Sequence, residues 1–399
     1  MKRFFEKDEL KLLWPFYFVP LFLGIFVLEN IFQIPYFISI GFSLSQIGFL
    51  ISAIGFASLL FEVPTGAIAD IFGRKFSVIS GIFVSGIVFF LTFFANKFIT
   101  VLILFFILGI AMTLISGAED AWVIDLLKHN KKKHLVQDYY SKFASFSAIG
   151  LFLAGFVGAF LVKSFGLKII WFVTGIAFLI NAFIFMFAKE HFIRRKSHVK
   201  EQIKETFSHS KKSIAFSIRH KIIFLLLISA FVLLFASAFA GRITWYPLLQ
   251  SRGFSDSWFG YLASATSVLA IFAPILVKPL VKKLKGYRRY SIFILLLIAI
   301  AFISVFAINF LIPAILIFLI SQFLWNMFSP ARATFFQSFV PDKMRATITS
   351  FRTMWVGLAA VISAPLAGFV ADKIGPQYTI VLGGLIIIPA IILYWRIKA

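Results

Sequence analysis

Six ionisable side chains lie inside long apolar runs of the sequence, namely Glu29, Glu62, Glu119, Asp120, Asp125 and Arg242. Charged groups in the hydrocarbon core of a membrane are costly, and they usually face a water-filled cavity or a charged partner. A carboxylate in apolar surroundings holds its proton more tightly than one in water, so Glu62 or Glu119 can bind and release a proton near neutral pH. These residues mark the positions where the chain can do chemistry within a membrane.

Glu62 and Glu119 lie at similar depths in their apolar runs. Each is about eight residues, or ~12 Å along a helix axis, from the end of its run, so we expect both to line one hydrated cavity. Asp120 follows Glu119 directly and points about 100° away around a helix, so we expect only one of the two to face that cavity. For Glu62 an equal alternative is that it caps or stiffens the helix kink at Pro64.

The reversal between the second and third apolar runs reads EVPTGAIADIFGRK. A chain cannot reverse inside a bilayer without leaving backbone groups unsatisfied, so this turn lies at the water interface. Asp70 can accept hydrogen bonds from a neighbouring helix N-terminus, where the helix dipole favours an anion. Gly66 and Gly73 permit close helix approach and a tight turn. Arg74 and Lys75 place positive charge beside the membrane.

The 399-residue chain is 61% hydrophobic, and only 14% of its residues are charged. Its mean hydropathy of +0.97 is typical of membrane proteins rather than soluble domains. The net charge of +23 would suit nucleic acid, but the charges fall in short islands between apolar runs, so we expect no nucleic-acid binding. Since the chain has no Cys, a disulfide framework, thiolate chemistry and a Cys-based metal site are excluded.

Twelve apolar runs are each long enough to cross a hydrocarbon core of about 30 Å at about 1.5 Å per residue. We interpret the first as a retained spanning helix, because no small-residue cleavage site follows it. The sequence therefore predicts an all-α integral membrane protein with twelve transmembrane helices. The expected spans are Leu13–Ile40, Gln46–Ala69, Phe76–Ala95, Phe98–Leu127, Tyr139–Val162, Leu167–Ala188, Ile222–Gln250, Ser257–Val281, Tyr290–Phe310, Ile312–Phe339, Thr347–Ala371 and Tyr378–Trp395.

The distribution of Lys and Arg predicts the orientation of these spans. With the N-terminus inside, 33 of the 39 basic residues fall on the cytoplasmic side and 6 on the outer side. Lys and Arg are enriched in cytoplasmic loops of membrane proteins. We therefore expect a multi-pass protein of the cell membrane with both termini in the cytoplasm.

The chain also repeats when it is shifted by 212 residues. Pro35 then meets Pro247, and Gly41, in the run Gly-Phe-Ser, meets Gly253 in the same run. A further set, Ser45, Gly48, Leu50, Ser52 and Ala53, matches Ser257, Gly260, Leu262, Ser264 and Ala265. A parallel repeat of this kind predicts two six-helix bundles, related by a pseudo-twofold axis along the membrane normal, around a central cavity.

The same shift places Glu29 and Arg242 at equivalent depths near the middle of the membrane, because Asn30 maps onto Arg242. Opposite charges reduce the cost of burial by pairing, so we expect the two side chains to meet in at least one state of the protein. The alternative is that each is satisfied by polar groups of its own bundle.

We expect the bundles to occupy residues 1–188 and 222–399, joined by a cytoplasmic linker at 189–221. Apolar residues of the linker recur at near-helical spacing among Lys and Arg, which favours an amphipathic helix on the membrane surface over a flexible tether. The six His residues, at 129, 134, 191, 198, 209 and 220, all fall in cytoplasmic segments. We interpret them as solvated loop residues, and we expect neither a metal nor a cofactor.

The spacing of Gly66, Asp70, Gly73, Arg74 and Lys75 between two spanning helices resembles the loop between helices 2 and 3 of the major facilitator superfamily. The runs EVPTG in helix 2 and SGAEDAWVID in helix 4 resemble one prokaryotic branch of that family, and the run VPDKMRAT resembles its loop between helices 10 and 11. The resemblance covers essentially the whole chain. It implies secondary active transport by rocking of two halves around a site near the midplane.

By this resemblance, Asp70, Arg74 and Asp125 form a charge network at the cytoplasmic ends of helices 2 and 4. The network, with Arg345 beside it, docks against helix 11 and holds the outward-facing state closed on the inside. The alternative for these residues is a plain salt bridge between helix ends.

Two positions depart from the proton antiporters of the family. Phe105 stands four residues before Gly109, where those antiporters often carry Arg, and Phe156 follows Gly155, where they often carry Pro. The reading as a proton-coupled drug exporter therefore loses two of its usual supports.

Our first expectation for function is export of a hydrophobic or amphipathic small molecule, with possible proton coupling through Glu62, Glu119 or Asp120. The alternatives are uptake of a small polar solute, a transport-inactive receptor and a lipid-acting membrane enzyme. The enzyme is the least favoured, because this chain has no Cys and no His within its expected spans. We expect a monomer in contact with lipids. The candidate residues of the substrate cavity are Glu29, Gln33, Tyr36, Trp122, Arg242, Trp245, Tyr246, Trp325 and Asn326.

Overall fold

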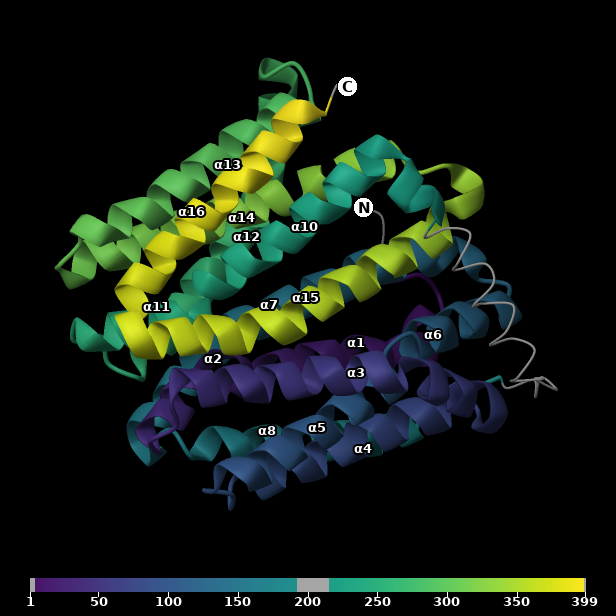
Figure 1. Ribbon diagram of the computed structural model, residues 1–399. Coiled ribbons are helices and arrows are strands. Elements are labelled where there is room, and N and C mark those ends of the chain that lie inside the picture. Colours follow the sequence, from purple (N-terminus) through teal and green to yellow (C-terminus); the bar gives the residue numbers. More distant parts are fainter. Residues whose placement is uncertain (1–3, 192–214, 398–399) are drawn as a thin grey trace. The chain divides into compact units, whose positions relative to one another are not determined.

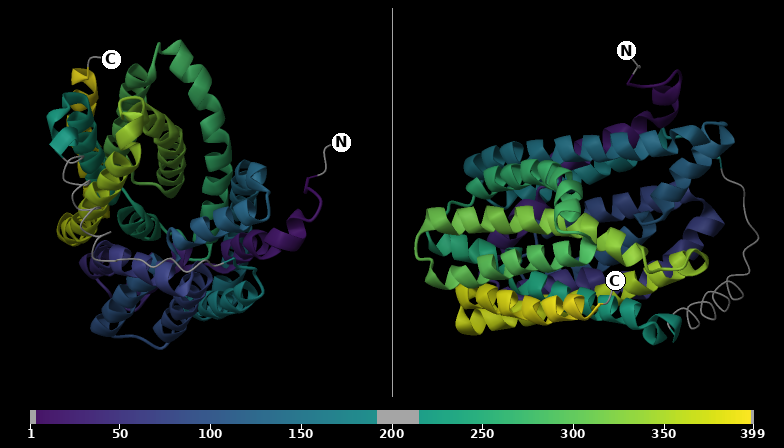
Figure 2. Two further views of the ribbon diagram at one scale, coloured as in Figure 1. Left: turned by 90° about the vertical axis from the view of Figure 1, so that its right-hand side faces the viewer. Right: turned by 90° about the horizontal axis from the view of Figure 1, so that it is seen from above.

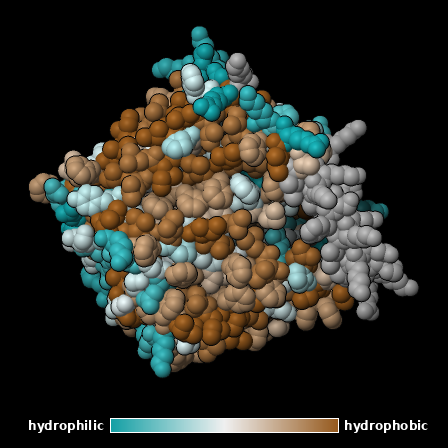
Figure 3. All heavy atoms as spheres, in the orientation of Figure 1, coloured by the Kyte–Doolittle hydropathy of each residue, from teal (hydrophilic) through white to brown (hydrophobic). Residues whose placement is uncertain are grey.

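Twelve helical spans among the described residues are long and apolar enough to cross a membrane. The computed structural model describes residues 4–191 and 215–397, and no strand occurs in those ranges. The twelve spans expected from the sequence are thereby confirmed, with ends that differ by a few residues. Apolar residues cover much of the face drawn in Figure 3, as expected of a surface that contacts lipid. The amphipathic helix expected in the linker lies largely outside the described residues.

Contacts between Cα atoms divide the chain into two compact units. One holds the described residues of Met1–Tyr36, Phe56–His198 and Asp256–Ser264, and the other holds those of Phe37–Gly55, Val199–Ser255 and Ala265–Ala399. Each unit thus includes a short segment from the other half of the sequence. The boundaries expected for the bundles and their linker remain a prediction.

In the first unit, α1 packs along α7, and α4 packs against both α5 and α8 (Figure 1). The helices of the first half of the chain are α1 (Glu9–Phe26), α2 (Glu29–Ser39), α3 (Leu44–Phe72), α4 (Arg74–Thr92), α5 (Phe98–Ile115), α6 (Ala118–His129), the 3-10 helix η1 (Lys133–Leu135), α7 (Val136–Phe165) and α8 (Ile169–Met186).

In the second unit, α16 packs against both α10 and α13, and Figures 1 and 2 both show the yellow α16 beside the teal α10. The helices of the second half are α10 (Lys221–Phe239), α11 (Arg242–Ser251), α12 (Trp258–Lys283), α13 (Tyr287–Ser304), η2 (Val305–Ala307), α14 (Leu311–Gln337), η3 (Asp342–Met344), α15 (Arg345–Ile374) and α16 (Pro376–Arg396).

Three of the twelve spans are broken helices, which the hydrophobic pattern does not reveal. The breaks separate α1 from α2, α5 from α6 and α10 from α11. At the first break, the amide of Leu28 donates to the Thr174 hydroxyl at 3.1 Å, and that hydroxyl donates to the carbonyl of Phe26 at 3.0 Å. A break in a membrane helix requires such partners, because no water is present to satisfy the freed backbone groups.

The backbone repeats with the period expected from the sequence. Gly41 and Gly253 end equivalent helices with φ values of 88° and 90°, in the left-handed region that favours glycine. The break at Leu28 falls at the same place in the repeat as the break at Ala240. The break between α5 and α6 has no counterpart in α14, which is continuous. The two halves of the chain therefore differ at the span that carries Glu119.

Small residues bring two pairs of helices into close contact. Gly48 of α3 lies against the backbone of Ala364 of α15, and Gly260 of α12 lies against the backbone of Gly155 of α7. Close approach through small residues is a common way for membrane helices to associate. In each pair, the two contacting residues belong to the same unit.

Asp372, near the end of α15, caps the N-terminus of α3. Its carboxylate accepts the backbone amides of Leu44 at 2.9 Å and Ser45 at 2.8 Å, and it also accepts the hydroxyl of Ser45. A carboxylate at a helix N-terminus satisfies free amides and interacts favourably with the helix dipole.

Candidate functional site

A cavity of about 520 Å³ lies within the first unit, lined by residues of α1, α3, α4, α5, α6, α7 and α8. Most of its wall is apolar. Its polar residues are Ser58, Glu62, Thr113, Ser116 and Glu119. The expectation that Glu62 and Glu119 line one cavity is confirmed.

The break between α5 and α6 positions Glu119 at this cavity. Gly117 has a φ of 70°, which favours glycine, and it allows α6 to begin in a new direction. Glu119 and Asp120 fall in the first turn of α6, where the helix dipole favours carboxylates. Glu119 is half-buried and lines the cavity, whereas Asp120 is exposed and accepts a hydrogen bond from the Tyr140 hydroxyl at 3.1 Å. Only one of the two neighbours faces the cavity, as expected.

Glu62 reaches the same cavity from α3. Nearby Pro64 lacks a backbone donor, and the Thr65 hydroxyl donates to the carbonyls of Phe61 at 2.7 Å and Glu62 at 3.2 Å. The side chain that binds the backbone at the proline is therefore Thr65. Across the described ranges, the Glu62 carboxylate has no hydrogen bond or ion pair, so no bond supports a role for it in the kink.

This arrangement places two carboxylates and three hydroxyl side chains in a cavity that is otherwise apolar. Such a cavity can hold an apolar molecule and offer a few polar groups to orient it. Carboxylates within membrane spans are also the groups that carry protons and cations in membrane proteins.

A second cluster lies where α3 ends and α4 begins. The Arg74 guanidinium forms an ion pair with Asp125 of α6 and donates to the carbonyl of Ala121 at 2.5 Å. The pair is partly exposed, with side-chain exposures of 24% and 46%, so its contribution to stability is modest. Gly73 has a φ of 103° and makes the tight turn expected between the helices.

Lys75 and Glu190 link the start of α4 to the end of α8 in both directions. The Lys75 ammonium donates to the carbonyls of Met186 at 2.7 Å and Ala188 at 2.8 Å, and the Lys75 amide donates to the Glu190 carboxylate at 2.9 Å. Each side chain satisfies backbone groups that a helix terminus leaves free. From the sequence, Lys75 is expected only to place positive charge beside the membrane. Its contact with the end of α8 is therefore a feature that the sequence did not predict.

The other residues of the expected network are not joined to this cluster. Asp70 is half-buried and has no hydrogen bond or ion pair to any residue that the structure describes. A Cβ atom built at Gly66 meets no heavy atom within 4 Å, so the close approach expected there is absent from the described structure. Arg345 is exposed and pairs with Asp342, three residues away, at 2.5 Å. The structure therefore joins Arg74 and Asp125 without Asp70, and docking against the eleventh span, α15, remains a prediction.

Two of the aromatic residues expected at the substrate cavity are core residues. Trp122 is 1% exposed, packs against Phe16 at 4.9 Å between ring centroids, and donates to the carbonyl of Lys189 at 2.9 Å. Trp245 is fully buried and packs against Phe318 at 5.5 Å. Large aromatic rings suit interhelical packing as well as a binding cavity, so the place of these two at a substrate cavity remains a prediction.

Glu29, at the start of α2, is buried and accepts hydrogen bonds from Asn30 at 3.1 Å and Thr174 at 3.4 Å. Its expected pairing with Arg242, which is exposed, remains a prediction. Of the other cavity candidates, Tyr36 and Tyr246 are buried, and Tyr36 packs edge-on against Trp171. Gln33, Trp325 and Asn326 are partly exposed, and the Asn326 amide donates to the carbonyl of Gln322 at 2.9 Å.

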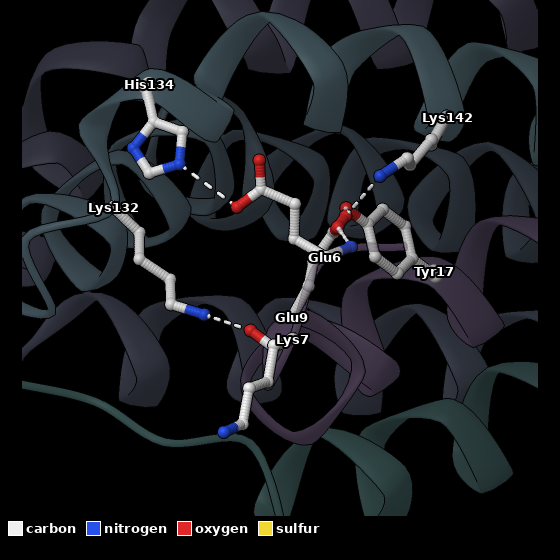
Figure 4. Close-up of polar contacts among 7 residues, drawn as sticks. All are labelled: Glu6, Lys7, Glu9, Tyr17, Lys132, His134 and Lys142. Carbon is white, nitrogen blue, oxygen red and sulfur yellow. Dashed lines mark hydrogen bonds and ion pairs between the residues drawn. The ribbon is translucent and has the colours of Figure 1, made fainter. Parts of the chain in front are cut away.

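A buried ion pair near the N-terminus is not evident from the sequence. Figure 4 shows Lys142 of α7 bound to Glu9 of α1 at 2.6 Å, with the Tyr17 hydroxyl donating to the same carboxylate at 2.6 Å. Glu6, which precedes Glu9 in the chain, contacts His134 at 3.1 Å. The only indication in the sequence is that Lys142 lies near the edge of an apolar run, and this does not identify Glu9 as its partner.

No group of three or more His, Asp or Glu in the two described ranges is placed to hold a metal ion.

Comparisons with known proteins agree with this architecture. A sequence family described as the Major Facilitator Superfamily matches residues 16–364. An uncharacterized MFS-type transporter of Bacillus subtilis, YxaM, is 23% identical over 367 residues, which cover 90% of this chain and 89% of the relative. Among solved structures, the nucleoside transporter NupG aligns over 96% of this chain and 98% of its own, with a TM-score of 0.71 and 14% identity. A D-xylose-proton symporter aligns over 97% and 98%, with a TM-score of 0.72 and 14% identity. The two solved structures show a shared fold.

Proposed function

Because the chain belongs to the Major Facilitator Superfamily, whose members are transporters and not enzymes, we propose that it exports a hydrophobic or amphipathic small molecule by alternating access. The observation that carries the proposal is the cavity of about 520 Å³ in the first unit, with its largely apolar wall. A cavity of this size and lining suits a drug-sized apolar molecule.

We further propose that protons drive the transport through Glu119, with Glu62 as its neighbour in the cavity. Both carboxylates line the cavity that would receive the substrate, and Glu119 is half-buried at a helix break. Protonation removes the charge of a carboxylate, so it changes both the cost of closing the cavity and its attraction for a substrate. Competition between substrate and proton for one cavity would give exchange.

Uptake of a small polar solute is the alternative, and one observation favours it. The hydroxyl groups of Ser58, Thr113 and Ser116 line the same cavity as the two carboxylates. Polar groups of this kind fix the orientation of a hydrogen-bonding solute.

We propose that the cluster at the start of α4 acts as a gate. Arg74 and Asp125 form its base, and Asp70 would find its partner at the eleventh span, α15, only in the outward-facing state. In support, Asp70 has no hydrogen bond or ion pair among the described residues although it is half-buried. A carboxylate at such a position is available to cap a helix N-terminus.

We propose a monomeric protein of the cell membrane with both termini in the cytoplasm, in contact with lipids, and with a small molecule and protons as its ligands. The 33-to-6 distribution of basic residues supports the orientation. Because the chain has no Cys, single Cys residues placed at 189–191 provide a clean test. An impermeant thiol reagent should label them only in opened cells, and labelling of intact cells would contradict the orientation.

The test of the proposed function is a flux assay over a compound panel. Purified chain is reconstituted into liposomes, and movement of amphipathic compounds and of small polar solutes is compared with that in protein-free liposomes. Export predicts flux of amphipathic compounds, and flux of polar solutes alone would favour uptake. Absence of flux for every compound in the panel would speak against a transporter of either class.

A further inference from the structure

Two arginines of the second unit, Arg332 of α14 and Arg352 of α15, lie within membrane spans, near their ends. Arg332 is five residues before the end of α14 and Arg352 seven residues after the start of α15, which places them ~8 Å and ~10 Å from the helix ends. Both are only partly exposed. They thus lie at similar depth, near the loop that joins the two helices.

The two side chains share one aromatic stripe. Phe328, Arg332 and Phe336 follow one another at intervals of four residues and therefore lie on one face of α14. The Arg332 guanidinium carbon is 5.6 Å from the centre of the Phe328 ring, and that of Arg352 is 4.6 Å from the centre of the Phe336 ring. Two positive charges are therefore held against apolar rings on a common surface.

Neither guanidinium has a hydrogen bond or an ion pair to any residue that the structure describes. Beyond residue 215 the chain has only three acidic residues, Asp256, Asp342 and Asp372. Asp342 pairs with Arg345, and Asp372 lies twenty residues along α15 from Arg352, or about 30 Å away. Neither Asp342 nor Asp372 therefore compensates the charge of the two arginines.

Buried polar atoms beside these arginines also lack partners. The Nε atom of Arg332 and the indole nitrogen of Trp355, one turn after Arg352, are inaccessible to solvent and have no hydrogen-bond partner in the part of the chain that the structure describes. In native proteins, buried donors without a partner usually bind a ligand or an ordered water. Every free group here is a donor, so the site would take an acceptor with negative charge.

We propose that Arg332 and Arg352 bind an oxyanion, a carboxylate or a phosphate, carried by an amphipathic molecule whose apolar part lies against the phenylalanines. Guanidinium groups match the planar geometry of a carboxylate and bind phosphate through several hydrogen bonds. The inference deepens the proposed function and rests on it insofar as the anion is the transported substrate. The same chemistry is offered by the phosphate of an anionic lipid, and the experiment separates these sources.

The test is equilibrium binding to the purified full chain in a neutral detergent, measured by calorimetry. The probes are decanoate and decyl phosphate, with decanol as the neutral probe of equal chain length. The two anions should bind wild type at least roughly tenfold more tightly than decanol, and Arg332→Gln or Arg352→Gln should remove that difference. Arg289→Gln, which removes an exposed arginine on α13, is the matched control and should bind like wild type. Arg332→Lys, which keeps the charge, should retain part of the preference.

Two results would overturn the site. One is equal affinity of wild type for decanoate and decanol, which stays decisive even if the Gln variants fail to fold. The other is an unchanged preference for anions in folded Gln variants. A further arm repeats the titration in nanodiscs of phosphatidylcholine with and without phosphatidylglycerol. Loss of decanoate affinity with phosphatidylglycerol assigns the site to lipid phosphate, and retained affinity assigns it to a substrate. Because binding is measured without transport, a failure of the flux assay leaves this result intact.

Discussion

Ser52 and Ser264 make the same contact in the two halves of the chain. The Ser52 hydroxyl of α3 donates to the carbonyl of Val361 on α15 at 2.6 Å, and the Ser264 hydroxyl of α12 donates to the carbonyl of Phe152 on α7 at 2.7 Å. The serines are 212 residues apart, as are the glycines Gly48 and Gly260 one turn before them, which also pack against the facing helices. The sequence repeat therefore corresponds to a repeated helix contact, between α3 and α15 and between α12 and α7.

Alternating access requires such crossings to open and close, which predicts that a covalent lock at one of them stops transport. A Cβ atom at Gly55 would lie 3.2 Å from Cγ2 of Val361, so the pair Gly55→Cys and Val361→Cys is close enough for a disulfide. Oxidation should abolish substrate flux in liposomes and reduction should restore it. The matched control is Gly86→Cys with Leu179→Cys, which joins α4 to α8, two helices of the first half of the chain. Continued flux in the oxidised test pair, with the disulfide verified by mass, would contradict a moving crossing.

Replacement of the cavity carboxylates should separate binding from coupling. Glu119→Gln keeps the size of the side chain but cannot lose a proton, so accumulation driven by a pH gradient should stop while substrate binding persists. Glu62→Gln should lower the accumulation less, because Glu62 is the more exposed of the two. Asp120→Asn, which alters the neighbour bound to Tyr140, is the control. If both Gln variants still accumulate substrate against its gradient, protons are not coupled through this cavity.

Asp70 and Arg74 should differ in their effects on stability. Asp70→Asn removes no hydrogen bond or ion pair among the described residues, so its thermal midpoint should match wild type while transport falls sharply. Arg74→Ala breaks the pair with Asp125 and the bond to Ala121, so it should lower both transport and stability, the latter by about 1 kcal/mol for a partly exposed pair. The check is thermal unfolding in detergent beside flux in liposomes. Wild-type flux in Asp70→Asn would refute the gating role.

The ion pair of Lys142 and Glu9 should be a major determinant of stability in the first unit. The two side chains are 12% and 0% exposed, so removing one partner leaves a buried charge at a cost of about 3–5 kcal/mol. Lys142→Met should therefore lower the thermal midpoint strongly, and Glu9→Gln added to it should recover much of the loss. Tyr17→Phe, which removes only one hydrogen bond to Glu9, should cost about 1–2 kcal/mol. A double variant no more stable than Lys142→Met would show that the pair itself contributes little.

The membrane spans and the repeat could be predicted from the sequence, because apolar length and matched glycines report directly on spanning helices and their turns. Gly41 and Gly253 illustrate this, since the sequence repeat and the left-handed φ values coincide. The helix break at Leu28 could not be predicted, since the freed backbone groups are satisfied by a side chain distant in the sequence, Thr174. An apolar pattern does not record which side chain will satisfy a freed backbone amide.

The site was predicted in part for the same reason. Depth along a helix was enough to place Glu62 and Glu119 at one cavity, because helical rise is constant. It did not give the packing partners of Trp122 and Trp245, because depth along a helix does not record which way a side chain points. The arginines 332 and 352 sit close enough to helix ends to count as ordinary loop charges, and only the absence of acidic partners in the structure sets them apart.

The most direct measurement is accumulation of a substrate in liposomes with an imposed pH gradient, with a dissipated gradient as the reference. We predict that wild-type chain concentrates an amphipathic substrate when the gradient is present, that collapse of the gradient releases it, and that Glu119→Gln gives only equilibration. Accumulation in wild type that is indifferent to the gradient, or equal accumulation by Glu119→Gln, would contradict proton-driven transport through the acidic cavity.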